Sequence, residues 1–461
     1  MLLYGIEMEV KNRPVLDEVF IPLAQFCRAF LKTAGKPVSI AVHRNNGFVS
    51  VFDTFIHGTP SMQEADRYFT ERTVKFLLWA KGGYMITFCG DKEMADYLAE
   101  VYSYSGARAF DCRFMERVFE KPFAVEFLPW DKKPHEYEIS KPLGRHLGGC
   151  RIGFDAGGSD RKVSAVIDGI AVFSEEIVWY PKTNGDPDYH FNGIVEALKS
   201  AAGHMPRVDA IGISSAGIYI DNRAMVGSLF MKVTDELFNA KVKDIYVRAA
   251  REIGEIPVEV ANDGDVTALA GAMELQDTNV LGIAMGTSEA AGYVDGCGNI
   301  TGWLNELAFA PVDGQPGAPA DEWSGDIGCG VKYFSQDAVI RLAREAGIRL
   351  DDTCTPAEKL KTIQLHLEAN HPGAHKIYET IGAYLGHTLP FYTAVYDSRH
   401  VLLLGRVMSG KGGGIILDTA IKILRDEYPE IHAVLQLHLP EEKSRRVGQS
   451  VAAASLPANE R

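Results

Sequence analysis

Two carboxylates and an amide follow a strand-like segment near the middle of the chain. Residues 258–262 read Val-Glu-Val-Ala-Asn, and Asp263 and Asp265 come directly after them. A carboxylate within hydrogen-bonding reach of a hydroxyl can act as a general base, and a neighbouring amide can orient the molecule that carries the hydroxyl. We therefore assign Asp263 as the candidate base and Asn262 as the candidate orienting residue. Capping of the helix predicted over 266–273 is the alternative role for either aspartate.

A glycine-rich turn earlier in the chain could hold phosphate. A strand-like run that begins at residue 151 ends at Asp155, and Gly157, Gly158 and Ser159 follow it. Glycine has no Cβ, so its backbone N–H groups can approach phosphate oxygens closely. Asp155 could hold Mg²⁺ through a water molecule, and Ser159 could contact a phosphate. An ordinary tight turn is the alternative, because Asp-x-Gly-Gly occurs in many hairpins.

Two later turns have a similar composition. One ends the strand-like run 279–284, and the other follows the run 401–405 and precedes a helix predicted over 415–425. A helix N-terminus with exposed amides suits a nucleotide. Each turn alone is better explained as an ordinary tight turn, but three of them in this order predict a nucleotide site. The residues expected to bind the nucleotide in these two turns are Gly286, Thr287, Ser288, Gly405, Ser409 and Gly410.

The first segment of the chain has a pattern of its own. Ser61 and Glu64 have the spacing of a capping box, which predicts the start of a helix. Together these patterns predict a small α/β or α+β domain over residues 1–130. Its expected elements are a hairpin at 38–52, a helix from Ser61 toward Trp79, a strand at 84–88, a helix at 92–104 and a strand at 123–128.

The remainder of the chain predicts an α/β core. Residues 131–148 are rich in Pro, Gly and charge, which indicates a linker. From residue 149 strands alternate with helices, and this alternation implies a parallel or mixed sheet covered by helices. The last expected helix spans about 445–454.

The motif order resembles that of the ROK family of sugar kinases from about residue 149 to residue 456. The resemblance implies a two-lobed actin-like or hexokinase-like ATPase core with ribonuclease H-like lobes. Lobe I would span 149–275, with the first phosphate turn and the catalytic aspartate, and lobe II would span 276–456, with the second phosphate turn and an adenosine loop. The last helix would return to lobe I. The matching motifs are Asp-x-Gly-Gly-Ser at 155–159, Gly-Ile-Ser-Ser-Ala-Gly at 212–217, Asn-Asp at 262–263, Gly-Thr at 286–287, Asn-Glu-Leu at 305–307 and Leu-Gly at 404–405.

The resemblance also implies an activity, which is transfer of the ATP γ-phosphate to a sugar hydroxyl by a carbohydrate kinase. Such chemistry depends mostly on positioning and on stabilising charge. Asp263 would take the hydroxyl proton, the three turns would hold Mg·ATP, and ATP and Mg²⁺ would be the cofactors. The expected substrate contacts are Asn262, Glu306, Ala216, Gly217 and Tyr219, with a structural role equally open for Tyr219.

Four positions depart from the family's pattern. Phe309 replaces a histidine, Val331 replaces an acidic sugar contact, and Glu289 lies beside the second phosphate turn. Cys329 lacks the cysteine partners of the family's zinc cluster, and since one thiolate cannot build a four-coordinate site we expect no structural zinc. The lost sugar contacts predict a different substrate, less polar or smaller. Phe309 and Trp303 are candidates for an apolar wall of its site, and a position in the core is the alternative for either.

Composition limits the partners. The 47 Lys and Arg against 61 Asp and Glu give a formal charge of −14, and no basic run stands out, so nucleic-acid binding is not expected. The N-terminus lacks a signal-peptide pattern, and no apolar run could span a bilayer, so we expect a cytoplasmic protein without a membrane partner. The seven scattered cysteines indicate reduced thiols. The expected partner is a sugar-like small molecule, and the resemblance makes a homodimer a reasonable expectation.

A non-catalytic sugar- or nucleotide-binding sensor on the same fold is the alternative to an enzyme. Repressors of the family carry an N-terminal winged helix-turn-helix. Here the corresponding segment is strand-rich at 38–55 and acidic at 62–66, without a basic recognition helix, so a DNA-binding repressor is not expected. A sensor that binds another protein through residues 1–130 stays open.

Overall fold

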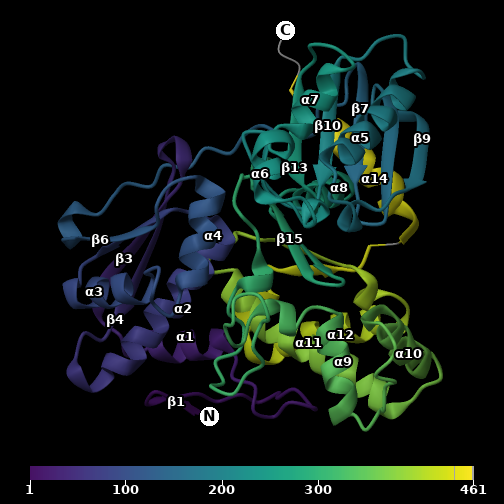
Figure 1. The fold of residues 1–461 in the computed structure, drawn as a ribbon. Coiled ribbons are helices and arrows are strands. Elements are labelled where there is room, and N and C mark those ends of the chain that lie inside the picture. The colour runs from purple at the N-terminus through teal and green to yellow at the C-terminus, as the bar shows by residue number, and fades with distance from the viewer. Residues whose placement is uncertain (441, 459–461) are drawn as a thin grey trace. The chain divides into compact units, whose positions relative to one another are not determined.

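The computed structural model describes residues 1–440 and 442–458 of the chain. Its elements are labelled in Figure 1 and group into two compact units. Unit 1 contains Met1–Ile139, Ile283–Ala291 and Trp303–Leu439, and unit 2 contains Ser140–Gly282, Gly292–Gly302 and the segment that begins at Pro440. The N-terminal segment therefore belongs to the same unit as most of the second half of the chain. Among the described residues, no helix combines the length and the apolar character needed to cross a membrane.

Unit 2 is built on a five-stranded sheet with the order β13-β10-β7-β8-β9. β7, β8 and β9 form an antiparallel meander, whereas β10 pairs in parallel with both β7 and β13. In this register Ser214 pairs with Asp155 and Ser215 pairs with Asn262, so these residues lie at one edge of the sheet. The strands are β7 (Cys150–Ala156), β8 (Asp160–Ile167), β9 (Ile170–Val178), β10 (Ala210–Ser215) and β13 (Val258–Asn262).

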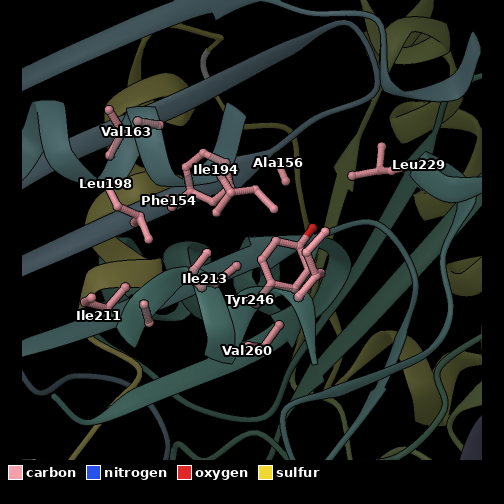
Figure 2. Close-up of a cluster of buried hydrophobic side chains, with 14 of the residues drawn as sticks. Phe154, Ala156, Val163, Ile194, Leu198, Ile211, Ile213, Leu229, Tyr246 and Val260 are labelled. Atoms are coloured by element: carbon pink, nitrogen blue, oxygen red, sulfur yellow. The ribbon is translucent and has the colours of Figure 1, made fainter. Parts of the chain in front are cut away.

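The hydrophobic core of unit 2 lies between this sheet and the helices α5 (Pro187–Ala202) and α7 (Ile245–Arg251). Figure 2 shows Phe154 and Ile213 from the strands beside Ile194 from α5 and Tyr246 from α7. Each of these four side chains is at most 1% exposed. Removal of this apolar surface from water is the main force that holds the helices against the sheet.

The other face of the sheet is covered by α14 (Glu442–Ala454), which packs against β7, β10 and the helix α8 (Asp263–Leu275). Neighbouring strand residues point to opposite faces, so Gly153 faces away from Phe154. A Cβ on Gly153 would lie 1.8 Å from the Ser450 carbonyl oxygen, and one on Gly212 would lie 1.7 Å from that of Ala453. Glycine at both positions is therefore what allows α14 to approach the sheet. The short elements of unit 2 are β11 (Ile218–Ile220), β12 (Arg223–Val226) and α6 (Asp235–Leu237).

A second sheet has the order β15-β14-β16-β17. Its strands β14 (Val280–Met285), β15 (Glu289–Val294), β16 (His400–Leu404) and β17 (Gln436–His438) include the three strands predicted to end near 284, 405 and 437. In unit 1, α11 and α12 pack side by side (Figure 1). The helices of this part are α9 (Gln336–Glu345), α10 (Pro356–Glu368), α11 (Pro372–Tyr392), α12 (Lys411–Glu427) and α13 (Pro429–His432).

The N-terminal part of unit 1 contains a mixed sheet with the order β4-β3-β5-β6. The hairpin predicted at 38–52 is confirmed, since β3 and β4 pair antiparallel. The predicted capping box is wrong, because Met62 precedes the first residue of α2 and no side chain caps that helix. The elements are β1 (Leu2–Leu3), β2 (Ile6–Glu7), α1 (Leu23–Leu31), β3 (Lys36–His43), β4 (Val49–Ile56), α2 (Gln63–Lys81), β5 (Met85–Cys89), α3 (Lys92–Val101), α4 (Ala109–Phe119) and β6 (Ala124–Leu128).

Candidate functional site

Asp155 lies at the end of β7, where the parallel strands of unit 2 meet. Its side chain is 7% exposed, and the Ser214 hydroxyl donates a hydrogen bond of 2.8 Å to its Oδ1 atom. Burial raises the pKa of Asp155 to about 6, the Ser214 hydrogen bond opposes this rise, and the charge of Asp263 adds to it. The carboxyl is therefore mostly ionised at neutral pH, as a residue that holds a cation through water must be.

The turn after Asp155 is held by a tryptophan and lies beside a lysine. The Trp179 indole N–H donates to the Gly157 carbonyl oxygen at 2.7 Å and fixes the turn. A Cβ on Gly158 would lie 2.9 Å from Lys182 Nζ, so the ammonium of Lys182 stands directly over this glycine. Ser159 donates to Asp160 Oδ2 at 3.0 Å and is exposed. The turn thus combines a glycine surface with a cation, the two features that a phosphate group requires.

Lys182 is a residue that the sequence analysis missed. It belongs to the 3-10 turn Pro181–Thr183, which follows β9 and lies 24 positions after Gly158 in the chain. The charge of this lysine opposes the rise that burial causes in the pKa of Asp263. No local motif marks it, since a lysine in a turn before a helix is ordinary, and only the sheet order brings it to the phosphate turn.

Asn262 and Asp263 lie where β13 ends and α8 begins. Asn262 is the N-cap of α8, because its Oδ1 accepts the Gly264 N–H at 2.7 Å, and its Nδ2 donates to the Gly217 carbonyl oxygen at 2.7 Å. The capping role considered for the aspartates therefore belongs to Asn262. Asp265 is buried and accepts the Tyr293 N–H at 3.1 Å instead.

Asp263 is half-buried, and its carboxylate is held by the backbone at the start of α8. Its Oδ1 accepts the Gly264 N–H at 3.1 Å. Burial raises the pKa of its carboxyl, while the Gly264 hydrogen bond and the charge of Lys182 oppose this rise. A raised carboxyl pKa strengthens the base, provided that the group is still ionised at the working pH.

The loop after β10 carries the other substrate contacts expected in unit 2. Ala216 and Gly217 are half-buried, and Gly217 has φ 140° and is joined to Asn262 through its carbonyl. The Tyr219 ring packs 5.9 Å from the ring of Tyr246, edge to face, and joins the hydrophobic core. This position favours the structural role that was left open for Tyr219.

In unit 1, the second phosphate turn lies between β14 and β15. The Gly286 N–H donates to the Ser288 carbonyl oxygen at 2.9 Å, and Thr287 and Ser288 are exposed. Gly405, at φ 95°, ends β16 beside this turn, since a Cβ there would lie 2.3 Å from the Met285 carbonyl oxygen. The structure thus places the predicted second and third turns next to each other.

The third turn leads into the N-terminus of α12. Ser409 and Gly410 are exposed, and Gly410, at φ 65°, is the residue before the first helical position. The Lys411 N–H donates to Glu368 Oε1 at 3.3 Å. The Lys411 ammonium also pairs with this carboxylate, at 3.6 Å, so the Glu368 side chain lies at the start of α12.

Glu289, the carboxylate beside the second turn, faces the interior of unit 1. It is 3% exposed, and neither of its oxygens has a hydrogen-bond partner among the described residues. Its Oε2 packs against Gly330, where a Cβ would lie 2.3 Å away. Burial and the charge of Glu306 raise the pKa of Glu289 to about 8. A carboxyl group that stays largely neutral explains how Glu289 can lie so near a phosphate turn.

The segment 303–309 carries Glu306, the remaining expected sugar contact. Glu306 is half-buried, and its N–H donates to the Trp79 carbonyl oxygen at 2.9 Å. Phe309, which replaces the family's histidine, packs with its ring centroid 4.3 Å from that of Trp79. Val331 is half-buried in the 3-10 turn Gly330–Lys332.

The residues around Cys329 do not fit a zinc site. The thiol is buried, its Sγ lies 3.7 Å from Asp326 Oδ2, and burial raises its pKa to about 12. In the part of the chain that the structure describes, no group of three or more His, Cys, Asp or Glu side chains is arranged to hold a metal ion.

Comparisons with known proteins identify the class of this chain. The chain matches the ROK family over residues 151–424 and belongs to that family. A ROK hexokinase from Thermus thermophilus is 20% identical and superposes with a TM-score of 0.52, over 67% of this chain and 97% of that one. A ROK transcriptional regulator, a homologue of the Escherichia coli MLC protein, is 18% identical with a TM-score of 0.53, over 67% of this chain and 79% of that one. No curated protein matches the chain significantly.

These likenesses confirm the predicted fold class. The chain is a mixed α/β protein with the hexokinase-like core of ROK sugar kinases, and additional α/β elements precede that core. The same fold serves a hexokinase and a regulator. The fold therefore does not decide between the two functions, which must be argued from the site.

Proposed function

We propose that this protein is an ATP-dependent carbohydrate kinase, which transfers the γ-phosphate to a hydroxyl of a sugar or sugar-like small molecule. The observation that carries the proposal is the edge of the unit 2 sheet. There Asp263 is half-buried with a raised pKa, and Asp155 and the Gly158 turn with its lysine belong to the same edge. A sensor that only binds its ligand does not need a base, a carboxylate for a cation and a glycine turn with a lysine at one site.

Each residue has a stated task in this proposal. Asp263 accepts the proton of the acceptor hydroxyl while the hydroxyl oxygen bonds to the γ-phosphorus and the bond to the β,γ-bridging oxygen breaks. The raised pKa of Asp263 favours this transfer. Lys182 and the Gly158 amide region hold phosphate oxygens and offset their charge. Asp155 would hold Mg²⁺ through water, and the ion would neutralise charge on the phosphates.

The remaining predicted residues divide between nucleotide and acceptor. Glu306 would accept hydrogen bonds from the acceptor, and the exposed hydroxyls of Thr287 and Ser288 would donate to phosphates. Asn262 already uses its amide to cap α8 and to hold Gly217, so its contribution is to fix the loop that meets the acceptor. The substitution of a histidine by Phe309 supports an acceptor less polar than glucose at that position.

A non-catalytic sensor is the second candidate, because a ROK regulator has the same fold and because two sugar contacts are missing. A sensor would bind its ligand without turnover, and Asp263→Asn would leave that binding intact.

The test is a panel of hexoses, amino sugars, pentoses and polyols, incubated with Mg·ATP and assayed for ADP release. For wild type we expect release that depends on one class of compound. Asp263→Asn should lower turnover by roughly 10²–10⁴, the usual worth of a general base, with ATP affinity nearly unchanged. Asp188→Asn, which alters an exposed aspartate of α5, is the matched control and should behave as wild type. Nucleotide binding without release for any compound would favour the sensor, and failure to bind nucleotide would refute the kinase.

A further inference from the structure

The segment 303–309 is joined by its backbone to the end of α2. The N–H groups of Leu304, Asn305 and Glu306 donate to the carbonyl oxygens of Lys81, Ala80 and Trp79, at 3.3, 3.0 and 2.9 Å respectively. The last carbonyls of a helix have no partner within it, so they are free to accept such bonds. As a result, α2 sets the backbone position of the expected acceptor residue Glu306.

The side chain of Trp303 is held by the N-terminal residues on two sides. Lys81 Nζ lies 3.1 Å from the ring centroid, and the indole N–H donates to Glu138 Oε2 at 3.3 Å. Glu138 in turn accepts from Arg44 and Ser50, so its own position is fixed. Burial lowers the pKa of Lys81 to about 8, while the charge of Glu138 opposes this effect, so the lysine remains a cation near neutral pH.

An aromatic cluster fixes the other end of the segment. Phe309 packs against Trp79, and the rings of Phe110 and Phe114 from α4 lie 5.7 and 6.2 Å from that of Phe309. Trp79 is fully buried, and its indole N–H donates to Asp111 Oδ1 at 2.6 Å. The N-terminal residues thus supply most of the aromatic surface around Phe309.

A buried ion cluster also joins the N-terminal segment to the rest of unit 1. The Asp326 carboxylate forms ion pairs with Arg72 and Lys75 of α2, at 3.1 and 3.0 Å, and with Arg108, at 2.6 Å. Lys75 is completely buried and also meets Asp111 at 3.3 Å. Separating these groups would leave uncompensated charges out of water, which is strongly unfavourable. The N-terminal segment is therefore not an appended module that can leave the rest of unit 1.

From these contacts we infer that residues 1–139 are the frame that positions the acceptor-binding segment 303–309, and that Lys81 is a positioning residue for Glu306. The inference deepens the proposed function and rests on it to the extent that Glu306 binds the acceptor. It assigns a role to the N-terminal segment that does not require a further ligand or protein partner. The anchoring itself can be tested without any substrate.

The experiment compares Lys81→Met, which keeps an unbranched stem but removes the cation over Trp303, with Lys81→Arg, which keeps a cation. Gln63→Ala, at the opposite end of α2, is the matched control. Hydrogen exchange of peptides that cover 303–309 measures the anchoring near pH 7. The KM for the acceptor, the KM for ATP and kcat measure its consequence.

A buried cation–π contact typically changes an equilibrium by roughly 5- to 30-fold. Lys81→Met should therefore speed exchange in 303–309 and raise the acceptor KM by about this factor, with the ATP KM unchanged. Lys81→Arg should keep the exchange rate and the acceptor KM close to those of wild type, and Gln63→Ala should change neither the exchange rate nor the acceptor KM. The inference would be overturned if Lys81→Met left hydrogen exchange in 303–309 unchanged, or if it raised the KM for ATP as much as the KM for the acceptor. If wild type phosphorylates nothing but exchange still responds to Lys81→Met, the proposed kinase function fails while the anchoring stands.

Discussion

Glu289→Gln is a direct test of the buried carboxyl beside the second phosphate turn. Glu289 is 3% exposed and has no hydrogen-bond partner for either oxygen among the described residues. A carboxyl whose pKa is higher in the folded than in the unfolded state stabilises the fold at low pH. That stabilisation is fully present below the unfolded pKa and is lost as the pH rises through the folded pKa.

The magnitude follows from the size of the shift. Burial, with the charge of Glu306, raises the pKa of Glu289 from 4.5 to about 8. Each pKa unit corresponds to ~1.4 kcal/mol. Between pH 5 and pH 7 the carboxyl ionises in the unfolded chain but stays protonated in the folded one, so the stability of wild type should fall by about 2–3 kcal/mol. Glutamine cannot ionise. The free energy of unfolding of Glu289→Gln, relative to wild type, should therefore rise by that amount over the same interval.

The assay is urea unfolding from pH 5 to pH 8, followed by tryptophan fluorescence. Four of the five tryptophans (79, 130, 303 and 323) belong to unit 1, so the signal reports mainly on the unit that contains Glu289. The difference between variant and wild type cancels the titration of other groups. Glu64→Gln, at an exposed position of α2, should show no such trend. A difference that stays constant with pH would refute the reasoning, because it would mean that Glu289 titrates equally in both states.

Two further variants test the unit 2 site and its sheet. Lys182→Met removes a cation whose charge opposes the rise in the pKa of Asp263, so the acid limb of the kcat/KM profile should move to higher pH. The value of kcat should also fall by about tenfold or more, because a charge near the phosphates is lost. An acid limb that does not shift would contradict this assignment of Lys182. Gly153→Ala should cost ~3 kcal/mol of stability in urea unfolding, because its Cβ would lie 1.8 Å from the Ser450 carbonyl oxygen. Gly148→Ala, with nothing within 4 Å, is its control, and equal midpoints for the two variants would count against the packing of α14.

The core elements could be predicted because their signals are local. A β-rich run that ends in Asp155, Asn262 or Gly286 has a polar or glycine residue at the point where the strand ends, and the structure has strand ends at or next to these positions. The order of the motifs then supplied the resemblance to a family, which no single run contains. The match of residues 151–424 to the ROK family confirms that part.

Side-chain partners could not be predicted, since they depend on which distant elements meet. Lys182 reaches the Gly158 turn only because β7, β8 and β9 fold into one meander. Asn262 rather than an aspartate caps α8, because the first helical residue is Asp263 and the cap must precede it. Ser61 failed as a cap because it lies inside a 3-10 turn, Pro60–Met62, that directly precedes α2.

The role of the N-terminal segment was unreadable for the same reason. The hairpin and helices of residues 1–130 are marked by local patterns, but their contacts with 303–309 and Asp326 span more than 200 positions of sequence. A charged residue such as Lys75 in a helix normally indicates a solvated face. Here it is fully buried, and only the ion partners Asp111 and Asp326 make that tolerable.

The central claim is tested most directly by following the phosphate itself. Wild type and Asp263→Asn would be incubated with Mg²⁺, ATP labelled at the γ-phosphate and the acceptor found in the panel, and the products would be separated by chromatography. The account predicts a labelled phosphate ester of the acceptor with wild type, formed roughly 10²–10⁴ times more slowly by the variant. Labelled inorganic phosphate without an ester, or an ester formed equally fast by both proteins, would contradict it.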